Sequence, residues 1–378
     1  MNMQSKEVYE EFRGMVRRLA VDKILPNAAE TDATSLPPEK SYAAFREAGM
    51  LGLPFPEALG GQDGDLFTQV IAMEELARVC ATSALSLMTP WAALDPVVHF
   101  GSDELKNLLI PAAARGEIRA GWCLTEPRGG SDLPGMISRA ERRGDDWVIN
   151  GTKRFITNAT WAQWYLVLAR TGDKDYGIFM VHHEDKGISF GKLEKKMGLR
   201  GSPTADVIFD NCVVPASRVV GDPTRGYPNM MLSLSYSRPL IAAQALGIAQ
   251  GALDEAVKYT KERNQFGQPV ARFQMVRGMI ADMAVKVESS RALLYRAVEA
   301  AMDGKNADNA RSLASMAKLL CSDTAMSVAT DAVQLHGGYG YLQDYPVERM
   351  MRDAKITQIY EGTNQIQRLI IAKHVYQS

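Results

Sequence analysis

A glutamate near the C-terminus has the neighbours that a catalytic base needs. Glu361 is followed by Gly362 and Thr363 in the segment ITQIYEGTNQIQR, at the expected start of the last helix. A carboxylate can take a proton from a weak carbon acid when burial raises its pKa and hydrogen bonds stabilise the anion that forms. Taken alone, the position is more typical of an acid that caps a helix, because helix N-termini attract negative charge.

Four other segments offer groups that bind a planar ring or a phosphate. CLTEPRGGSD at 123–132 combines hydroxyls with adjacent glycines, and RFITNATWAQWY at 154–165 places a phenylalanine before a threonine and an asparagine. ERNQFGQPVARFQ at 262–274 holds arginines, amides and phenylalanines, and the segment 334–353 begins QLHGGYGY. Hydroxyls, amides and open backbone N–H groups suit such ligands, although each segment alone also fits an ordinary turn or strand end.

Three zones of different periodicity position these segments. Residues 1–118 and 228–378 repeat apolar positions at helical spacing, and in the first zone Ser102 is the expected N-cap of a helix. Residues 119–227 contain short β-rich runs separated by turn residues, which predicts an antiparallel β unit. The expected strands are Trp147–Thr152, Trp164–Ala169, Gly177–His182 and Ala205–Phe209. Three long amphipathic helices in the last zone suggest a bundle.

Composition excludes several classes of protein. The chain has 378 residues, 46% hydrophobic and 23% charged, with a net charge of −1. These values are typical of a globular protein and give no sign of a nucleic-acid or anionic-membrane partner. No apolar run reaches the roughly 18 residues of a membrane span. The charged N-terminus resembles neither a signal nor a transit peptide, so we expect a cytoplasmic protein.

Cofactor and metal motifs are sparse. No strand leads into a G-x-G-x-x-G loop, so a Rossmann dinucleotide site is not expected. The adjacent histidines His182 and His183 lack metal-ligand spacing, and we expect no metal. The four cysteines are far apart and form no C-x-x-C pair, which favours reduced, unlinked thiols. They are Cys80, Cys123, Cys212 and Cys321.

In their order along the chain, these segments resemble the acyl-CoA dehydrogenase family over essentially the whole sequence. The resemblance includes the two signature stretches at 125–132 and 334–353 and the terminal Tyr-Glu-Gly-Thr at 360–363. It implies an α+β, mostly α fold: an N-terminal helical domain, a middle antiparallel β-barrel-like domain and a C-terminal four-helix bundle. The expected domains are 1–118, 119–227 and 228–378. The implied cofactor is FAD, between the middle and C-terminal domains.

The resemblance also implies the residues that hold FAD. Those lining the flavin ring are Trp122, Cys123, Leu124, Thr125, Gly130, Ser131, Phe155, Ile156 and Thr157. Those holding the cofactor from the C-terminal domain are Thr363, Asn364 and Gln365. The pyrophosphate and adenosine are expected between two subunits, with Arg263, Gln265, Phe266, Phe273 and Gln274 from one and Gln334, Leu335, Gly337 and Gly338 from its neighbour.

For the reaction, the resemblance implies that Glu361 takes the α proton while the β hydride goes to the flavin. One subset of the family carries its base beside the segment SLSYSRPL, where this chain has Tyr236 and Ser237 and no carboxylate. This absence favours Glu361. Arg238 matches a family arginine near the base, although a structural ion pair explains it equally well. The implied substrate-binding residues are Ser131, Ser235, Tyr236, Arg238, Tyr360 and Gly362.

The acyl group is less well specified. Thr82 lies where decarboxylating glutaryl-CoA members carry an arginine, which argues against a distal carboxylate. Trp91 and Asp95 are atypical on the expected pocket helix, and we expect them to shorten or polarise the cavity, which favours a short, branched or cyclic acyl group. Chain length, and the choice between CoA and an acyl carrier protein, stay open.

The resemblance implies an electron-transferring flavoprotein as partner and a homotetramer built as a dimer of dimers. Two alternatives use the same fold. An acyl-CoA oxidase or a flavin monooxygenase differs in what reoxidises the flavin, and Glu361 argues against the monooxygenase. A non-catalytic flavin- or acyl-CoA-binding subunit is the other alternative, and the presence of every expected ligand position argues against it.

Overall fold

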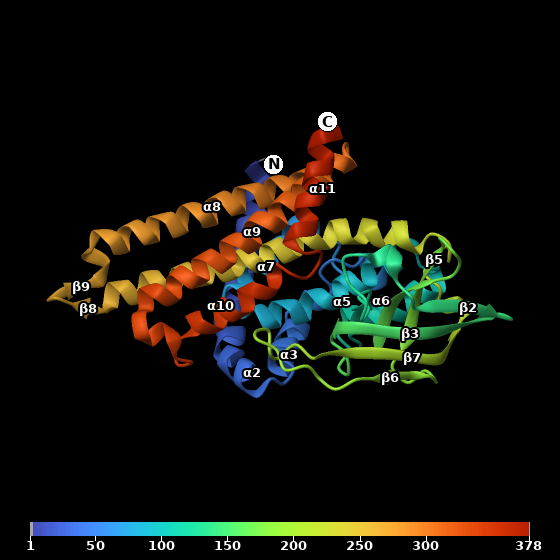
Figure 1. The fold of residues 1–378 in the computed structure, drawn as a ribbon. Helices are drawn as coiled ribbons and strands as arrows, with labels where there is room; N and C mark the ends of the chain where they lie inside the picture. Colours follow the sequence, from blue (N-terminus) through green and yellow to red (C-terminus); the bar gives the residue numbers. More distant parts are fainter. Residues whose placement is uncertain (1–2, 378) are drawn as a thin grey trace.

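The structure is a computed structural model that describes residues 3–377, and its N-terminal part is helical (Figure 1). Its α-helices are α1 (Met3–Leu19), α2 (Ala28–Thr34), α3 (Glu39–Glu47), α4 (Leu66–Ala77), α5 (Ala81–Phe100) and α6 (Asp103–Ala114). A π-helical turn, η1 (Ala20–Ile24), continues α1, and short 3-10 turns link the others: η2 (Leu25–Asn27), η3 (Met50–Gly52) and η4 (Glu57–Leu59). The Ser102 side chain accepts a hydrogen bond from the backbone N–H of Leu105, which confirms the predicted N-cap.

A curled sheet follows. Its strands are β1 (Ala120–Cys123), β2 (Arg139–Arg143), β3 (Asp146–Thr157), β4 (Trp164–Arg170), β5 (Tyr176–His182), β6 (Ile188–Phe190) and β7 (Thr204–Pro215), with the 3-10 turns η5 (Leu133–Gly135) and η6 (Ala216–Arg218) in the connections. The strand order is β1-β4-β2-β3-β7-β6, with β5 on β4. Most pairings are antiparallel as predicted, but β1 and β2 run parallel to β4. β1 can run parallel to β4 because two strands and their loops lie between them in sequence.

Long helices return in the C-terminal part. They are α7 (Gly226–Glu262), α8 (Gln274–Asp303), α9 (Ala307–His336), α10 (Pro346–Thr357) and α11 (Asn364–Gln377). A small hairpin, β8 (Asn264–Gln265) with β9 (Gln268–Pro269), and the turn η7 (Val270–Arg272) join α7 to α8, while η8 (Gly337–Tyr341) follows α9. Helices α7, α8 and α9 lie side by side, with α10 and α11 against α9, and α7 extends from the sheet to the hairpin (Figure 1).

Two hydrophobic cores hold these parts together. The larger core joins the N-terminal helices to α7, α8 and α9, and the smaller core fills the curl of the sheet. In the larger core α5 is buried almost all round, which fits its mostly apolar sequence with small hydroxyl side chains. The expected domain boundaries after residues 118 and 227 fall just before β1 and just inside α7, and they stay predictions.

A buried ionic network also links the first and last parts of the chain. Arg13 of α1 donates to Glu75 at 2.8 Å, and Arg291 of α8 donates to the adjacent Glu74 at 2.9 Å. Both carboxylates are buried on α4. All four cysteines are buried and free, as predicted. Among the helices of residues 3–377, none is long and apolar enough to cross a membrane.

Candidate active site

The loop between α10 and α11 carries Glu361 in an unusual backbone conformation. Glu361 has φ +55° and Gly362 has φ +90°, so two successive residues are left-handed, which a glycine tolerates and a glutamate rarely adopts. The helix is capped by Thr363, whose hydroxyl accepts the backbone N–H of Ile366 at 3.3 Å. Glu361 is therefore not the capping acid. The strained loop directs its side chain toward α7 instead.

The carboxylate of Glu361 meets α7. Ser237 Oγ donates to Glu361 Oε2 at 2.9 Å. Burial raises the pKa of Glu361, while this hydrogen bond and the positive charges of Arg238 and Lys318 act in the opposite direction. Burial in turn lowers the pKa of Arg238, whose Nε is buried without a partner. A base with a raised pKa beside a buried, unsatisfied cation suits a site completed by a polar ligand.

A buried lysine forms hydrogen bonds to the loop that carries Glu361. Lys318 of α9 is fully buried, and its Nζ donates to Gly362 O and to Asn364 Oδ1, each at 2.9 Å. Gln367 Nε2 donates to Glu361 O at 3.1 Å and to Gly362 O at 3.0 Å. The loop carbonyls are thus held by two side chains from two helices, which fixes the strained conformation. Burial lowers the pKa of Lys318 to about 8.

Glu361 lines a cavity of about 420 Å³ between α5, α7 and the sheet, called here the Glu361 cavity. The predicted residues that line it are Trp122, Leu124, Thr125, Gly130, Ser131, Phe155, Ile156, Thr157, Arg238, Tyr360, Glu361 and Gly362. The rest of the wall is mostly apolar and comes from Leu85, Met88, Thr89, Ala92, Leu133, Tyr227, Met231, Leu234, Ile241, Ile366 and Ile370. The cavity therefore combines one carboxylate and one guanidinium with hydroxyls and a large apolar surface, which is how small-molecule sites are built.

A buried ion pair shapes the loop after β1. Glu126 accepts the backbone N–H groups of Ile137 at 2.6 Å and Ser138 at 3.0 Å. Lys153 of β3, fully buried, donates to Glu126 at 2.9 Å and to Leu124 O at 3.2 Å. The neighbouring loop residues are thereby presented to the cavity from a fixed backbone.

Phe155 reaches the cavity through a β-bulge. The pairing of β3 with β7 shifts between Lys153 and Ile156, and Phe155 has φ +58°. A bulge re-aims a side chain that regular alternation would place elsewhere. The Phe155 ring is 58% exposed, so it offers a flat apolar face to a ligand.

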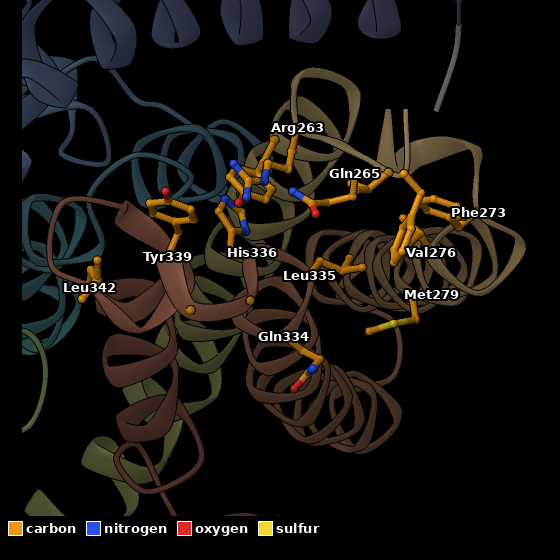
Figure 2. Close-up of a pocket in the computed structure, with 15 residues that line it drawn as sticks. Arg263, Gln265, Phe273, Val276, Met279, Gln334, Leu335, His336, Tyr339 and Leu342 are labelled. Carbon is orange, nitrogen blue, oxygen red and sulfur yellow. The ribbon is translucent and has the colours of Figure 1, made fainter. Parts of the chain in front are cut away.

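A second cavity, of about 640 Å³, lies at the far end of α7 and is called the Arg263 cavity (Figure 2). Arg263, Gln265, Phe266 and Phe273 line it near the hairpin, and Gln334, Leu335, Gly337 and Gly338 line it at the end of α9. A Cβ built on either glycine meets nothing within 4 Å, so a ligand can approach the backbone closely there. A guanidinium, two amides and two aromatic rings suit a phosphate and a heterocyclic base.

This arrangement corrects one expectation. Arg263 and its neighbours were expected to face Gln334 and Gly338 across two subunits, but both groups line one cavity of a single chain. They come together because the hairpin after α7 and the end of α9 lie at the same end of the helical bundle (Figure 1).

Family models match the chain from end to end. Residues 6–117 match the acyl-CoA dehydrogenase N-terminal domain, 121–212 the middle domain and 224–376 the C-terminal domain. The cyclohexane-1-carbonyl-CoA dehydrogenase of Geobacter metallireducens is 44% identical over 95% of each chain. The chain belongs to the acyl-CoA dehydrogenase family.

Other relatives support the same assignment. The short-chain specific acyl-CoA dehydrogenase of Clostridium acetobutylicum is 42% identical over 97% of both proteins. The butyryl-CoA dehydrogenase of Megasphaera elsdenii superposes with a TM-score of 0.93 at 36% identity, covering 98% of each chain. A chain of the structure described as the electron transferring flavoprotein of Acidaminococcus fermentans reaches 0.96 at 39% identity, covering 100% of both.

FAD is the cofactor of this acyl-CoA dehydrogenase. A glutaryl-CoA dehydrogenase of Mycobacterium smegmatis, solved with FADH2, has a TM-score of 0.93 at 26% identity over 100% of this chain and 96% of that one. The residues present fit the cofactor. Thr125, Ser131 and Thr157 supply hydroxyls and Phe155 supplies a flat ring to the same Glu361 cavity. The donors of the Arg263 cavity fit the phosphates and adenine.

Several predicted site residues lie outside both cavities. Cys123 is buried in the core of the sheet, Ser235 donates to Leu232 O, and Gln274 begins α8 without lining the Arg263 cavity. The side chain of Asn364 is bonded to Lys318, Ser322 and Asp323, which leaves it no role as a ligand-facing group. Thr363 caps α11, and Gln365 is exposed beside it.

Trp91 and Asp95 do not shape the Glu361 cavity as expected. Trp91 donates from Nε1 to Leu51 O at 2.9 Å, and Asp95 pairs with His99 at 3.2 Å. Both line a neighbouring cavity of about 360 Å³, called the Asp95 cavity, where Tyr236 also lies. At about 100° per residue Asp95 points nearly the same way as Met88 but lies about 10 Å further along α5, so the two cavities follow one another along the helix. Thr82 is buried on α5 and lines none of the three cavities described.

Sequence reasoning missed three residues that contact the loop of Glu361. In the sequence, Ser237 stands out only because another subset of the family has a carboxylate beside it. Lys318 and Gln244 belong to no motif. Gln244 accepts the hydroxyl of Tyr360 and is itself held by Ala81 O at 2.9 Å. The only signal for Lys318 and Gln244 was a polar residue on the apolar stripe of a helix.

One group of possible metal ligands lies apart from these cavities. The ligand atoms of His182, His183 and Glu184 lie within 4.8 Å of one another at the end of β5. Residue spacing along the chain does not reveal this proximity. The expectation that the chain holds no metal stays a prediction.

Proposed function

We propose that this acyl-CoA dehydrogenase removes the α proton of an acyl-CoA thioester with Glu361 as the base, giving the trans-2-enoyl thioester. The observation that carries the proposal is that Glu361 lines the same cavity as Thr125, Ser131 and Thr157, the residues expected to hold the flavin. When bound, FAD accepts the β hydrogen as a hydride. The protein contributes the base, its geometry and an environment without bulk water.

The roles of the residues follow from their positions. A raised pKa makes Glu361 a stronger base than an exposed carboxylate, and burial supplies that rise. Lys318 and Gln367 hold the backbone carbonyls of Glu361 and Gly362, which keeps the carboxylate and the N–H of Glu361 in one geometry. We assign the backbone N–H of Glu361 to the thioester oxygen, where negative charge develops.

The acyl group is proposed to lie against α5 and α7. Leu85, Met88, Ala92 and Ile241 give the Glu361 cavity an apolar wall. The cavity of about 420 Å³ must hold flavin groups as well as the acyl chain, so only part of this volume is left for the acyl chain. Relatives named for cyclohexane-1-carbonyl-CoA and for short-chain acyl-CoA support a short, branched or cyclic acyl group.

A shared cofactor and an oligomer are proposed from the length of α7. Arg238 lines the Glu361 cavity, and Arg263, 25 residues later, lines the Arg263 cavity. At 1.5 Å per helical residue the two lie about 37 Å apart, which is too far for one dinucleotide to bridge within a chain. We therefore propose that the Arg263 cavity serves the cofactor of a second copy, in a dimer of dimers.

The proposed electron acceptor is an electron-transferring flavoprotein. Similarity to a chain of the structure described under that name for A. fermentans supports this choice. An oxidase instead releases peroxide on every turnover. Measuring peroxide in air with and without an added electron-transferring flavoprotein distinguishes the two, and stoichiometric peroxide contradicts the dehydrogenase proposal.

The decisive experiment compares Glu361→Gln with Glu299→Gln, which makes the same change at an exposed position of α8. Both proteins should bind FAD and stay yellow. Both proteins are mixed anaerobically with a panel of acyl-CoAs. The flavin of the control should bleach at the wild-type rate, while the flavin of Glu361→Gln should bleach at least about 10³-fold more slowly. A loss near tenfold means that another group is the base.

A further inference from the structure

We infer that Ser237 and the Asp95 cavity form a proton-release route, in which Ser237 passes the proton of Glu361 to water in that cavity and the Asp95–His99 pair delivers it to bulk solvent. This inference rests on the proposed role of Glu361 as base. The route is needed because the proposed occupants of the Glu361 cavity, flavin and acyl thioester, close that side to water while the base is protonated.

Ser237 lies between the two cavities. Its Oγ is 2.9 Å from Glu361 Oε2, and the same residue lines the Asp95 cavity. Its Oγ also lies 3.4 Å from Leu234 O, so the hydroxyl has a second acceptor when it accepts from a protonated Glu361. A hydroxyl both donates and accepts, which is what a single relay position requires. Ala92 lines both cavities, so they share a wall.

The Asp95 cavity has the polar lining that ordered water needs. Ser233 Oγ and Asp95 Oδ2 are both buried without a hydrogen-bond partner, and both residues line this cavity. The volume of about 360 Å³ is far more than one water molecule needs, and the two unsatisfied oxygens give such a water two polar partners. Native proteins leave few such atoms unpaired, so water is the expected partner here.

The outer end of the route is the Asp95–His99 pair. His99 Nε2 is 3.2 Å from Asp95 Oδ1, and the His99 side chain is 49% exposed. Its ring lies parallel to that of Tyr236, which lines the cavity mouth from α7. The hydrogen bond to Asp95 raises the pKa of His99, while burial and the charge of Lys106 act in the opposite direction. A histidine that exchanges protons near neutral pH suits delivery to solvent.

The proton balance is simple. The α C–H bond breaks, its electron pair stays on carbon, and the proton binds Glu361. Ser237 then accepts that proton while its own proton moves to water in the cavity, and the water passes one on to the Asp95–His99 pair. Each step moves one proton and no electrons, so the route needs no further reactant.

The test follows the exchange of the α hydrogen in a thioester that has sulfur at the β position. Such a ligand can lose its α proton but has no β hydrogen to transfer, so only the proton steps are seen. With the α-deuterated ligand bound to the enzyme, mass spectrometry follows the loss of deuterium to water over time. The variants are Asp95→Asn and His99→Gln, which do not touch Glu361, with the exposed His183→Gln as the matched control.

We expect exchange to slow about tenfold or more in Asp95→Asn and His99→Gln, while ligand affinity and the extent of deprotonation stay at wild-type values. Ser237→Ala should also slow exchange, and Ser237→Thr, which keeps the hydroxyl, should restore it. Exchange within twofold of the wild type in both outer variants overturns the route.

The same assay separates this inference from the proposed function. Glu361→Gln should abolish exchange. If it does while the Asp95 and His99 variants exchange normally, only the release route is wrong. If Glu361→Gln still exchanges, the base itself has been misassigned.

Discussion

Lys153→Met should destabilise the protein strongly, because it leaves a buried carboxylate without its cation. Lys153 and Glu126 are both buried, 2.9 Å apart, and Glu126 retains only the backbone N–H groups of Ile137 and Ser138 after the change. Breaking a buried pair by removing one partner costs about 3–5 kcal/mol. In a chain of this size such a loss lowers the melting temperature by roughly 5–10 °C.

The assay is thermal unfolding at one fixed, saturating FAD concentration, because bound cofactor adds its own stability. Adding Glu126→Gln to Lys153→Met removes the stranded charge, so the double variant should recover more than half of the loss. Lys174→Met, in an exposed loop, is the control and should melt like the wild type. A Lys153→Met protein within about 1 kcal/mol of the wild type refutes the reasoning, since the pair then contributes little.

Three further outcomes are expected. Lys318→Met removes the charged donor from Gly362 O and Asn364 Oδ1, which keep only Gln367 and Ser322 as donors, so it should cost about 1–3 kcal/mol in thermal unfolding and slow α-deuterium exchange. Burial raises the pKa of Asp353 to about 6, so the native state holds a proton that the unfolded state has lost. Stability measured by denaturant should therefore fall on the order of 3 kcal/mol from about pH 4 to 6, and Asp353→Asn should lack that fall. A Cβ at Gly251 stands 2.1 Å from Arg78 O, so Gly251→Ala should destabilise by about 1–3 kcal/mol. Gly278→Ala, with nothing within 4 Å, should raise the melting temperature slightly, and a fall contradicts this packing argument.

Sequence patterns predicted the order of elements well. Apolar positions at helical spacing and alternating β runs are local signals, and each expected strand, such as Trp164–Ala169, lies inside an observed one. The motif around Glu361 and the segment Leu124–Ser131 were found because several polar or glycine residues cluster in a short stretch. Local clustering of this kind is visible without coordinates.

What the sequence did not predict depends on which way a side chain points. Cys123 belongs to the flavin-loop motif but faces the core of the sheet, because neighbouring strand residues alternate between faces. Trp91 and Asp95 are on the expected helix but line the neighbouring Asp95 cavity instead of the acyl cavity. Lys318 contacts the loop 44 residues later, and no local pattern reports a contact of that kind.

The distance between the two ends of α7 predicts that mutations at the two ends can complement each other. If each reaction centre draws its base from one chain and its nucleotide pocket from another, defects at the two ends can complement. A chain carrying Glu361→Gln mixed with one carrying Arg263→Ala should form hybrids in which one centre inherits both intact halves. Two inactive variants would then form active hybrid dimers, in which one of the two reaction centres is functional.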